Sequence, residues 1–185
     1  MLHVIALHGM SCHLEECWLD NVIENLKKLA ITDFQIPHFP LLKEITLERW
    51  EDVLLQYKDI FDENLVIIAH SLSTNFIIHF LYKYKLPAKA LIAVGGGYEN
   101  KEYGELGYLA PFTPKDYQFE YVKKAVKNRY HIFSDDDTIW TQNQIEKYNK
   151  LLSPIEIKTH GCGHYGRTSK VKDIPQIYEI VKSLK

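Results

Sequence analysis

Cysteine is scarce in this sequence, and long hydrophobic runs are missing. The 185 residues include three cysteines, Cys12, Cys17 and Cys162. Disulfide-stapled secreted domains carry more cysteines, in even number, so we expect reduced thiols in a cytoplasmic protein. No apolar stretch approaches the ~18 residues that span a bilayer, and the N-terminus lacks the basic residues and apolar length of a signal peptide. We therefore expect no membrane partner.

A surplus of charge of one sign is missing too. Lys and Arg number 22 against 24 Asp and Glu, which gives a formal net charge of −2. Because nucleic-acid binding proteins show a basic excess, we expect no nucleic-acid partner. Internal repeats, low-complexity tracts and Pro/Gly/Ser-rich linkers are also missing, so we expect a single domain over residues 1–185.

Short apolar runs alternate with longer amphipathic stretches along the chain. The runs are residues 3–7, 33–36, 65–69, 90–94, 130–133 and 155–159. Four of them are rich in Val, Ile or Leu without polar alternation, which is typical of strands buried on both faces of a parallel sheet. The helical candidates between them are residues 14–28, 47–61, 73–84, 116–126, 142–152 and 174–184. This alternation predicts an α/β fold, with a mostly parallel sheet and helices on both faces.

Polar and glycine residues follow most of the predicted strands. In a parallel sheet these segments meet at the carboxyl edge, where sites form. The segments are His8-Gly9-Met10, His70-Ser71-Leu72, Gly95-Gly96-Gly97, residues 134–137 and residues 160–164. The sequence therefore predicts a functional site assembled from several strand ends.

Ser71 stands where an apolar strand turns into an apolar helix. This arrangement is typical of the nucleophile elbow of α/β-hydrolases, written G-x-S-x-G, although Ala69 and Ser73 replace the two glycines. Both replacements are small, as the close approach of strand and helix requires. The alternative interpretation is that Ser71 only caps the helix.

A serine nucleophile needs a base, and the base needs an orienting acid. In this fold the chain order is Ser, acid, His, and the candidates after Ser71 are the run Asp135-Asp136-Asp137 and then His164. A competing interpretation is a metal site that uses His160, Cys162 and His164. No second ligand pair at a familiar spacing supports it, so we expect neither a metal nor a cofactor.

The sequence resembles the small serine-hydrolase family that includes retinoblastoma-binding protein 9, within the α/β-hydrolase superfamily. The segments that carry the resemblance are His8-Gly9 with Trp18 downstream, Ala69-His70-Ser71, residues 112–114, 117–119 and 134–137, and Cys162-Gly163-His164-Tyr165. The resemblance implies a three-layer fold of strand order 2-1-3-4-5-6 without a large cap domain, and a Ser-Asp-His triad. In the family the acid precedes a proline by four residues. Thr141 holds that position here, which favours Asp137 as the acid and leaves Asp136 as the alternative.

The oxyanion hole of such an enzyme uses two backbone N–H groups. We expect them from Leu72, directly after Ser71, and from Met10 in the loop after the first strand. The substrate pocket is expected to involve Gly9, His70, Trp18, Gly96, Trp140 and Tyr165. Residues 98–114 are either a mobile rim whose aromatics face the substrate or a surface loop whose aromatics pack downward.

The predicted function is a serine hydrolase that cleaves a small carboxylic ester or a related acyl bond through an acyl-enzyme. The expected partner is a small-molecule acyl ester, and nothing in the sequence indicates a protein partner. One alternative is a protein-binding module on the same fold with an idle triad. Another is an amidase or peptidase that uses the same triad.

Overall fold

A parallel sheet forms the centre of the molecule. The structure, a computed structural model, describes residues 1–11, 13, 17–98 and 104–185. Within these residues six strands pair in the order β2-β1-β3-β4-β5-β6, and every neighbouring pair is parallel. The strands are β1 His3–Leu7, β2 Phe34–Gln35, β3 Leu65–His70, β4 Ala90–Val94, β5 Asn128–Ser134 and β6 Ile155–Thr159. The predicted fold class and strand order are confirmed.

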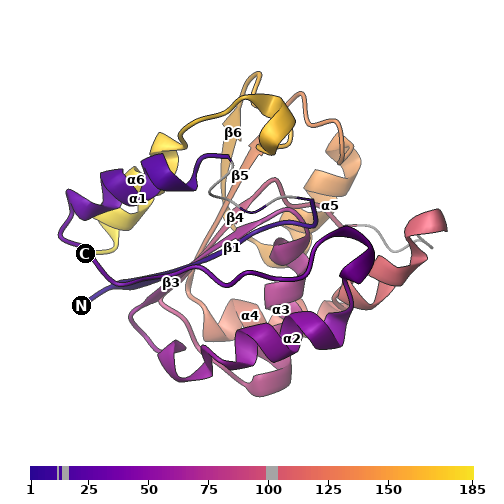
Figure 1. Cartoon of the computed structure of the whole chain (residues 1–185), viewed down its shortest axis with the longest axis horizontal. Helices are drawn as coiled ribbons and strands as arrows, with labels where there is room; N and C mark the ends of the chain where they lie inside the picture. The colour runs from indigo at the N-terminus through magenta and orange to yellow at the C-terminus, as the bar shows by residue number, and fades with distance from the viewer. Residues whose placement is uncertain (12, 14–16, 99–103) are drawn as a thin grey trace.

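Helices cover both faces of this sheet (Figure 1). They are α1 Leu19–Lys27, α2 Leu47–Leu55, α3 Leu72–Tyr84, α4 Asp116–Ala125, α5 Gln142–Leu152 and α6 Pro175–Ser183. A hydrophobic cluster lies on each face of the sheet. In one cluster α2, α3, α4 and α5 pack against the sheet, and in the other α1 and α6 pack against it. Alternate residues of β1 divide between them, with Ile5 in the first cluster and Val4 in the second.

The central strand β3 illustrates why the sequence forms this sheet. All six of its residues are buried, so it shows no polar alternation. The edge strand β6 differs, because all five of its residues are exposed or half-exposed. One face of β6 therefore carries the charged Glu156 and Lys158, which an edge strand tolerates.

Two predicted helices are several residues shorter in the structure, whereas those expected over residues 116–126 and 174–184 differ from α4 and α6 by no more than one residue at either end. The helix expected over residues 14–28 begins at Leu19 and ends at Lys27, and residues 14–16 lie outside the described part of the chain. The helix expected over residues 47–61 ends at Leu55. There the N–H groups of Gln56 and Tyr57 bond to carbonyls three residues earlier, and the 3-10 helix η3 (Lys58–Ile60) follows. Apolar spacing continues through these turns, so it could not mark where the α-helix ends.

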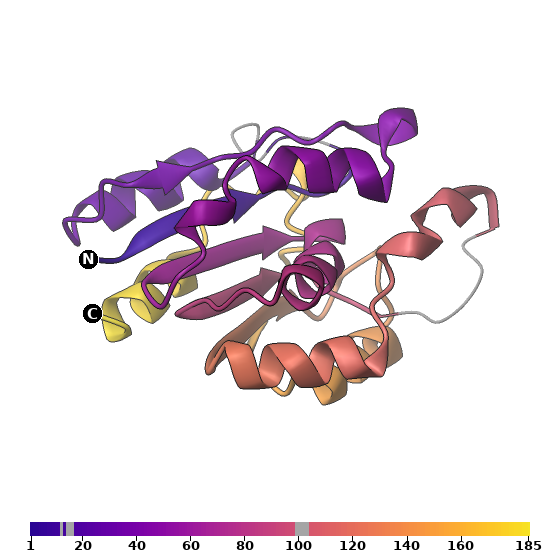
Figure 2. The same cartoon turned by 90° about the horizontal axis from the view of Figure 1, so that it is seen from below.

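The carboxyl ends of the strands point to one side of the molecule, opposite the two chain termini (Figure 2). The 3-10 helix η4 (Gly104–Phe112), which precedes α4, lies beyond that side. No large cap domain is present among the residues the structure describes. None of the helices in that part of the chain is long and apolar enough to cross a membrane.

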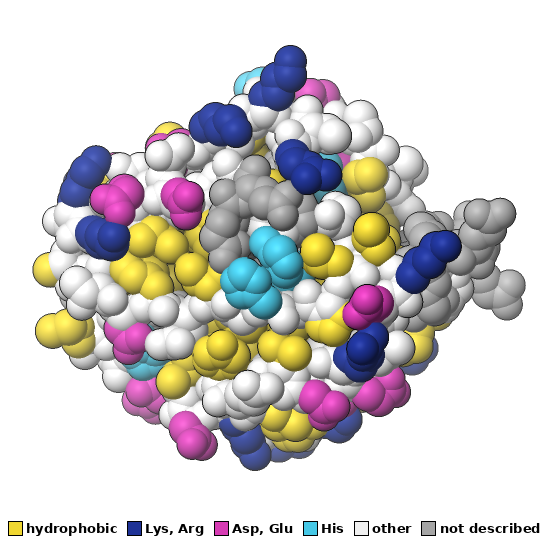
Figure 3. Space-filling view, in the orientation of Figure 1, with side chains coloured by type: hydrophobic (Ala, Val, Ile, Leu, Met, Phe, Trp, Pro, Cys, Tyr) yellow, Lys and Arg dark blue, Asp and Glu magenta, His cyan; other side chains and the backbone are white. Residues whose placement is uncertain are grey.

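Acidic and basic side chains are interspersed around the face drawn in Figure 3, with hydrophobic and histidine side chains towards its middle.

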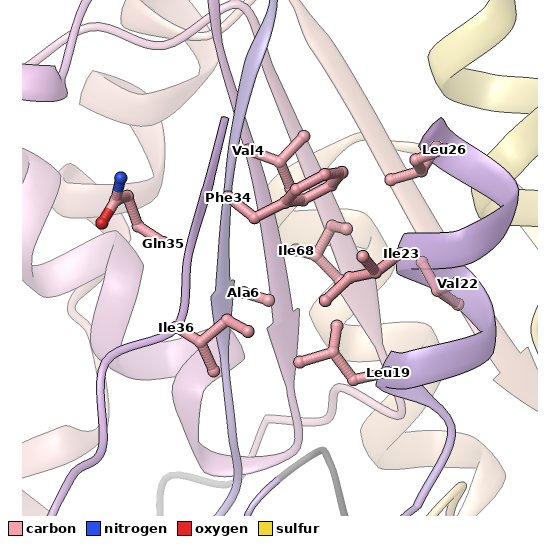
Figure 4. A pocket seen from close by; sticks show the side chains of 10 residues that line it. All are labelled: Val4, Ala6, Leu19, Val22, Ile23, Leu26, Phe34, Gln35, Ile36 and Ile68. Atoms are coloured by element: carbon pink, nitrogen blue, oxygen red, sulfur yellow. The ribbon is translucent and has the colours of Figure 1, made fainter. Parts of the chain in front are cut away.

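An apolar seam lies between α1 and the sheet (Figure 4). Val4, Phe34 and Ile68 face α1 across it, and Gln35 points away. The seam leaves no room for a water molecule, so it is a packing gap.

Candidate active site

Ser71 occupies a strained corner between β3 and α3. Its φ is 56° and its ψ is −121°, a conformation that serine rarely adopts. The corner is held by the Ser71 N–H, which donates to the Val94 carbonyl at 3.0 Å, and by Thr74, whose N–H and Oγ1 both donate to the Ser71 carbonyl. The Ser71 side chain makes no helix-capping hydrogen bond. The interpretation of Ser71 as a simple cap is therefore wrong.

Close packing around the corner explains the small residues nearby. A Cβ on Gly9 would stand 2.9 Å from the Ser71 Cβ, so the loop after β1 runs directly against the serine. Ser73, in the second glycine position of the elbow pattern, is fully buried and donates from its Oγ to the His8 carbonyl. The serine at that position therefore ties α3 to the loop after β1.

His164 joins Ser71 to Asp137. Its Nε2 lies 2.7 Å from the Ser71 Oγ, and its Nδ1 lies 2.8 Å from the Asp137 Oδ2. The Asp137 side chain is completely buried, and that of His164 is 14% exposed. The other carboxylate oxygen, Oδ1, accepts the N–H groups of Ile139 at 2.7 Å and Trp140 at 3.0 Å. The carboxylate is thus held from both sides while it faces the imidazole.

The pKa of Asp137 reflects two opposing effects. Burial acts to raise it, but the hydrogen bond and charge interaction with His164 and the two backbone N–H donors outweigh burial, so the pKa lies below its ordinary value. Asp137 is consequently ionised at neutral pH. An ionised carboxylate accepts a hydrogen bond from Nδ1–H, which leaves the Nε2 lone pair directed at the Ser71 hydroxyl.

The other two aspartates of the run do not reach the His164 ring. Asp136 accepts hydrogen bonds from the Ser134 hydroxyl at 2.5 Å and from the Gly163 N–H at 2.8 Å, so it braces the loop that carries His164. Asp135 pairs with His160 at 2.5 Å on the surface. The structure thus selects Asp137 from the predicted run by contact.

The competing metal interpretation finds no geometric support. His160 and His164 engage different aspartates through their Nδ1 atoms. Cys162 places its thiol near the His160 carbonyl, not between the two rings. Across the described ranges, His, Cys, Asp and Glu do not form a group suited to a metal ion.

Two backbone N–H groups remain available beside Ser71. Leu72 begins α3, and Met10 lies in the loop that Gly9 presses against the serine. Neither N–H has an acceptor among the residues described. The Met10 carbonyl accepts the Leu42 N–H at 3.0 Å, which anchors that loop. Both positions fit the predicted oxyanion hole. The N-terminus of α3, where Leu72 lies, also carries a partial positive charge that favours an oxyanion.

The residues predicted to form the substrate pocket are dispersed. Gly9 adjoins Ser71, and Trp140 adjoins Asp137 through its backbone. Trp18 and Tyr165 are only 1% exposed, and the Trp18 Nε1–H donates to the Tyr165 carbonyl at 3.0 Å. These two side chains therefore lie beneath the His164 loop and present almost no surface to a ligand.

Gly96 and His70 are also buried parts of the framework. The Gly96 N–H donates to the His131 Nε2 at 3.0 Å, and His70 contacts the His164 carbonyl through Nε2 at 2.8 Å. Burial lowers the His70 pKa to about 3 and the His131 pKa to about 4, so both rings are neutral at physiological pH. Sequence reasoning missed His131, because a histidine inside a strand gives no signal of its partner.

The glycine run after β4 contributes more than the predicted Gly96. A Cβ on Gly97 would stand 2.3 Å from the Trp140 ring, and one on Gly95 would touch the His164 ring at 3.4 Å. Gly95 also has a positive φ of 58°. Three consecutive glycines after a predicted strand indicated close packing at this point in the sequence, but they could not show which glycine contacts which side chain.

Residues 98–114 pack largely downward where the structure describes them. Tyr98, Leu109 and Phe112 are each at most 3% exposed and belong to the hydrophobic core. Residues 99–103, which include Tyr103, lie outside the described part, and so does Cys12. For Tyr98, Leu109 and Phe112, the prediction of a rim facing the substrate is wrong and the downward-packing alternative is confirmed.

Comparison with known proteins agrees with this geometry. Residues 4–183 match the family model described as serine hydrolase. The chain belongs to this family. The Bacillus subtilis (strain 168) protein called "Putative hydrolase YdeN" is 27% identical to this serine hydrolase over 189 residues, which cover 97% of this chain and 94% of YdeN.

Solved structures show the same fold. The crystal structure of the ydeN gene product from B. subtilis has a TM-score of 0.85 at 23% identity, covering 100% of this serine hydrolase and 98% of that chain. A structure reported with the carboxylesterases of the Thaumarchaeon Nitrososphaera gargenis has a TM-score of 0.68 at 13% identity, covering 98% and 89%. At these identities the likeness establishes the α/β-hydrolase fold.

Proposed function

We propose that this serine hydrolase cleaves small carboxylic esters through an acyl-enzyme on Ser71. His164 serves as the general base, and Asp137 orients it. The observation that carries the proposal is the continuous contact from Asp137 to His164 at 2.8 Å and from His164 to Ser71 at 2.7 Å. A base must lie within hydrogen-bond reach of the proton it takes, and these distances meet that condition.

The reaction follows from the placement of these groups. The Ser71 Oγ attacks the ester carbonyl carbon while the His164 Nε2 takes its proton, and the Asp137 carboxylate stabilises the imidazolium. The N–H groups of Leu72 and Met10 donate to the oxyanion that develops on the carbonyl oxygen. Collapse of the tetrahedral intermediate breaks the C–O bond, and the leaving alcohol receives the proton from His164.

Deacylation uses the same groups with water as the nucleophile. His164 takes a proton from the water, the hydroxide adds to the acyl carbon, and the oxyanion again lies between Leu72 and Met10. Collapse releases the carboxylic acid and returns the proton to the Ser71 Oγ. Each step needs only the three side chains, the two N–H groups, the substrate and water.

The choice between an ester and an amide substrate depends on the leaving group. The structure reported with the carboxylesterases of Nitrososphaera gargenis shares the fold of this chain, which is consistent with an ester substrate. An amidase or peptidase would use the same residues. Paired aryl ester and anilide substrates of one acyl group separate these activities, and a series of acyl chain lengths defines the preferred ester.

Ser71→Ala tests the central proposal. We expect hydrolysis of p-nitrophenyl acetate to fall at least about 10³-fold, because the triad acts as a unit, and fluorophosphonate labelling to disappear. Ser183→Ala, a change at an exposed serine of α6, is the control and should retain both activities. Wild-type activity or labelling in Ser71→Ala would refute the assignment, and a wild-type protein inert in both assays would favour the idle-triad alternative.

Chelation separates the triad from the metal interpretation. Dialysis against a strong chelator should leave the rate unchanged, since Ser71 and not a metal-bound water is the proposed nucleophile. A loss of activity that zinc restores would contradict the proposal.

A further inference from the structure

We propose that Trp18 and His70 are positioning residues that fix the catalytic histidine by binding two successive backbone carbonyls, those of His164 and Tyr165. This inference rests on the function proposed above. Neither side chain touches the reacting atoms in the proposed mechanism. They act through the loop that carries the base.

The two contacts join segments that lie far apart in the sequence. The His70 Nε2–H donates to the His164 carbonyl at 2.8 Å, and the Trp18 Nε1–H donates to the Tyr165 carbonyl at 3.0 Å. The two donor rings also pack edge to face, with centroids 6.1 Å apart and planes at 88°. Trp18 and His70 thus form one unit, which we call the carbonyl clamp.

The backbone of the His164 loop needs such support. Gly161, Gly163 and Tyr165 have φ values of 68°, 52° and 56°. A positive φ at a residue as bulky as tyrosine is strained and persists only where the surroundings hold it. The two carbonyls that the clamp binds, those of His164 and Tyr165, flank the N–H and Cα of Tyr165. The clamp therefore opposes a change of the Tyr165 backbone to a less strained conformation.

Burial makes the clamp stiff. Trp18 is 1% exposed and His70 is 3% exposed, so water does not compete for either bond. Burial, followed by repulsion from His164, lowers the His70 pKa to about 3. The ring therefore stays neutral and carries one N–H, which faces the His164 carbonyl. The opposite nitrogen, Nδ1, is buried without a donor among the described residues, as the Nε2–H tautomer allows.

The position of His70 links the base to the nucleophile. His70 is the last residue of β3, and Ser71 follows it directly. The same rigid strand end therefore presents the nucleophile and anchors the backbone of the base. A displacement of about 1 Å between reacting groups can cost roughly 10²-fold in rate. The clamp therefore keeps the 2.7 Å contact between the His164 Nε2 and the Ser71 Oγ.

Trp18→Phe tests the clamp, and Trp50→Phe is its matched control. Trp50 is likewise buried, and its Nε1–H donates to the Pro40 carbonyl at 3.0 Å on the opposite face of the sheet. Both variants lose one indole N–H hydrogen bond to a backbone carbonyl, so their melting temperatures should fall similarly. Trp18→Phe alone should lower kcat, by roughly 10-fold or more with KM unchanged, and should speed deuterium exchange in residues 161–167.

A pair of changes at His70 tests the second bond. His70→Gln retains an N–H donor of comparable reach, whereas His70→Met fills a similar volume without one. We expect His70→Gln to retain most of kcat and His70→Met to lose roughly 10-fold or more, with KM unchanged in both. Equal losses in the two variants would show that His70 acts only by packing.

The outcomes separate this inference from the proposed function. Equal effects of Trp18→Phe and Trp50→Phe on kcat, or unchanged deuterium exchange in residues 161–167 of Trp18→Phe, would overturn the clamp. A wild-type protein without hydrolase activity or fluorophosphonate labelling would overturn the proposed function. In that case the exchange measurement still decides whether Trp18 holds the loop.

Discussion

At the scale of the residue, the site depends on contacts that tolerate little change. Ser71 keeps a left-handed φ that costs about 1–3 kcal/mol and persists because Val94 and Thr74 hold its backbone. Asp137 is completely buried against His164. A change of a single atom at Ser71 or Asp137 therefore alters the proposed transfer of the Ser71 hydroxyl proton to His164.

Asp137→Asn should lower kcat by about 10³–10⁴-fold, because an amide cannot stabilise the imidazolium and favours the wrong tautomer of His164. Asp135→Asn is the matched control, since its carboxylate binds His160 at the surface and should have little influence on kcat. Steady-state ester hydrolysis on the two purified variants gives the comparison. The reversed ranking would assign the acid to another member of the run.

Gly9→Ala should lower kcat by roughly 10²-fold through crowding. The new Cβ would stand 2.9 Å from the Ser71 Cβ and 3.4 Å from its Oγ, so the loop with the Met10 N–H must move. Gly107→Ala, where the added methyl meets nothing within 4 Å, should keep wild-type kcat. Full activity in Gly9→Ala would argue against Met10 as an oxyanion donor.

At the scale of the element, helix packing sets the position of the strand ends. α1 lays Leu19, Val22 and Leu26 over β1 and β3, and the seam between them contains only apolar side chains apart from Gln35, which points away (Figure 4). α3 is buried on most sides because it crosses the centre of the other face. Helix α1 therefore stabilises the fold, and α3 also carries the corner at Ser71.

Leu26→Ala should reduce the free energy of unfolding by about 2–5 kcal/mol, because Leu26 is fully buried and its loss would enlarge the existing seam. Ile155→Ala removes a side chain that is 61% exposed and should cost less than about 1 kcal/mol. Urea unfolding at pH 7 measures both changes. Similar losses in the two variants would show that α1 packs less tightly than this structure has it.

At the scale of the whole molecule, parallel strand order brings distant segments to one edge. The segments that follow β1, β3, β4, β5 and β6 meet there and carry the triad. Two buried histidines, His70 in β3 and His131 in β5, lie within the strands. His70 and His131 have pKa values of about 3 and about 4 in the fold, against an ordinary 6.5. Their burial couples the stability of the molecule to pH.

The free energy of unfolding should fall as the pH drops from 6.5 towards 4. In this window the unfolded chain protonates both histidines and the folded protein does not, so the unfolded state binds more protons and acid favours it. Each histidine contributes at most about 1.4 kcal/mol per pH unit. Urea unfolding across the range should show this slope unchanged in His160→Gln, whose ring is 80% exposed, and reduced in His131→Gln. A flat profile in the wild type would contradict the buried, neutral state of both rings.

The sequence by itself determined the architecture and the order of the chemical groups. Strand runs and helical spacing are local patterns, because each strand or helix must bury its own apolar side chains. The predicted strands at residues 3–7, 90–94 and 155–159 match β1, β4 and β6 in full. The small residues around Ser71 likewise indicated a sharp corner, since steric limits act on neighbours in the chain.

Only the tertiary structure decided which groups touch. The local sequence around three consecutive aspartates does not show which of them reaches a histidine 27 positions away, but the fold brings the Asp137 carboxylate to the His164 ring. It also turned Trp18 and Tyr165 from predicted pocket residues into buried support for the loop, joined across 147 positions of sequence. The reason is that side-chain contacts between strand ends depend on loop paths and helix packing, which no local pattern encodes.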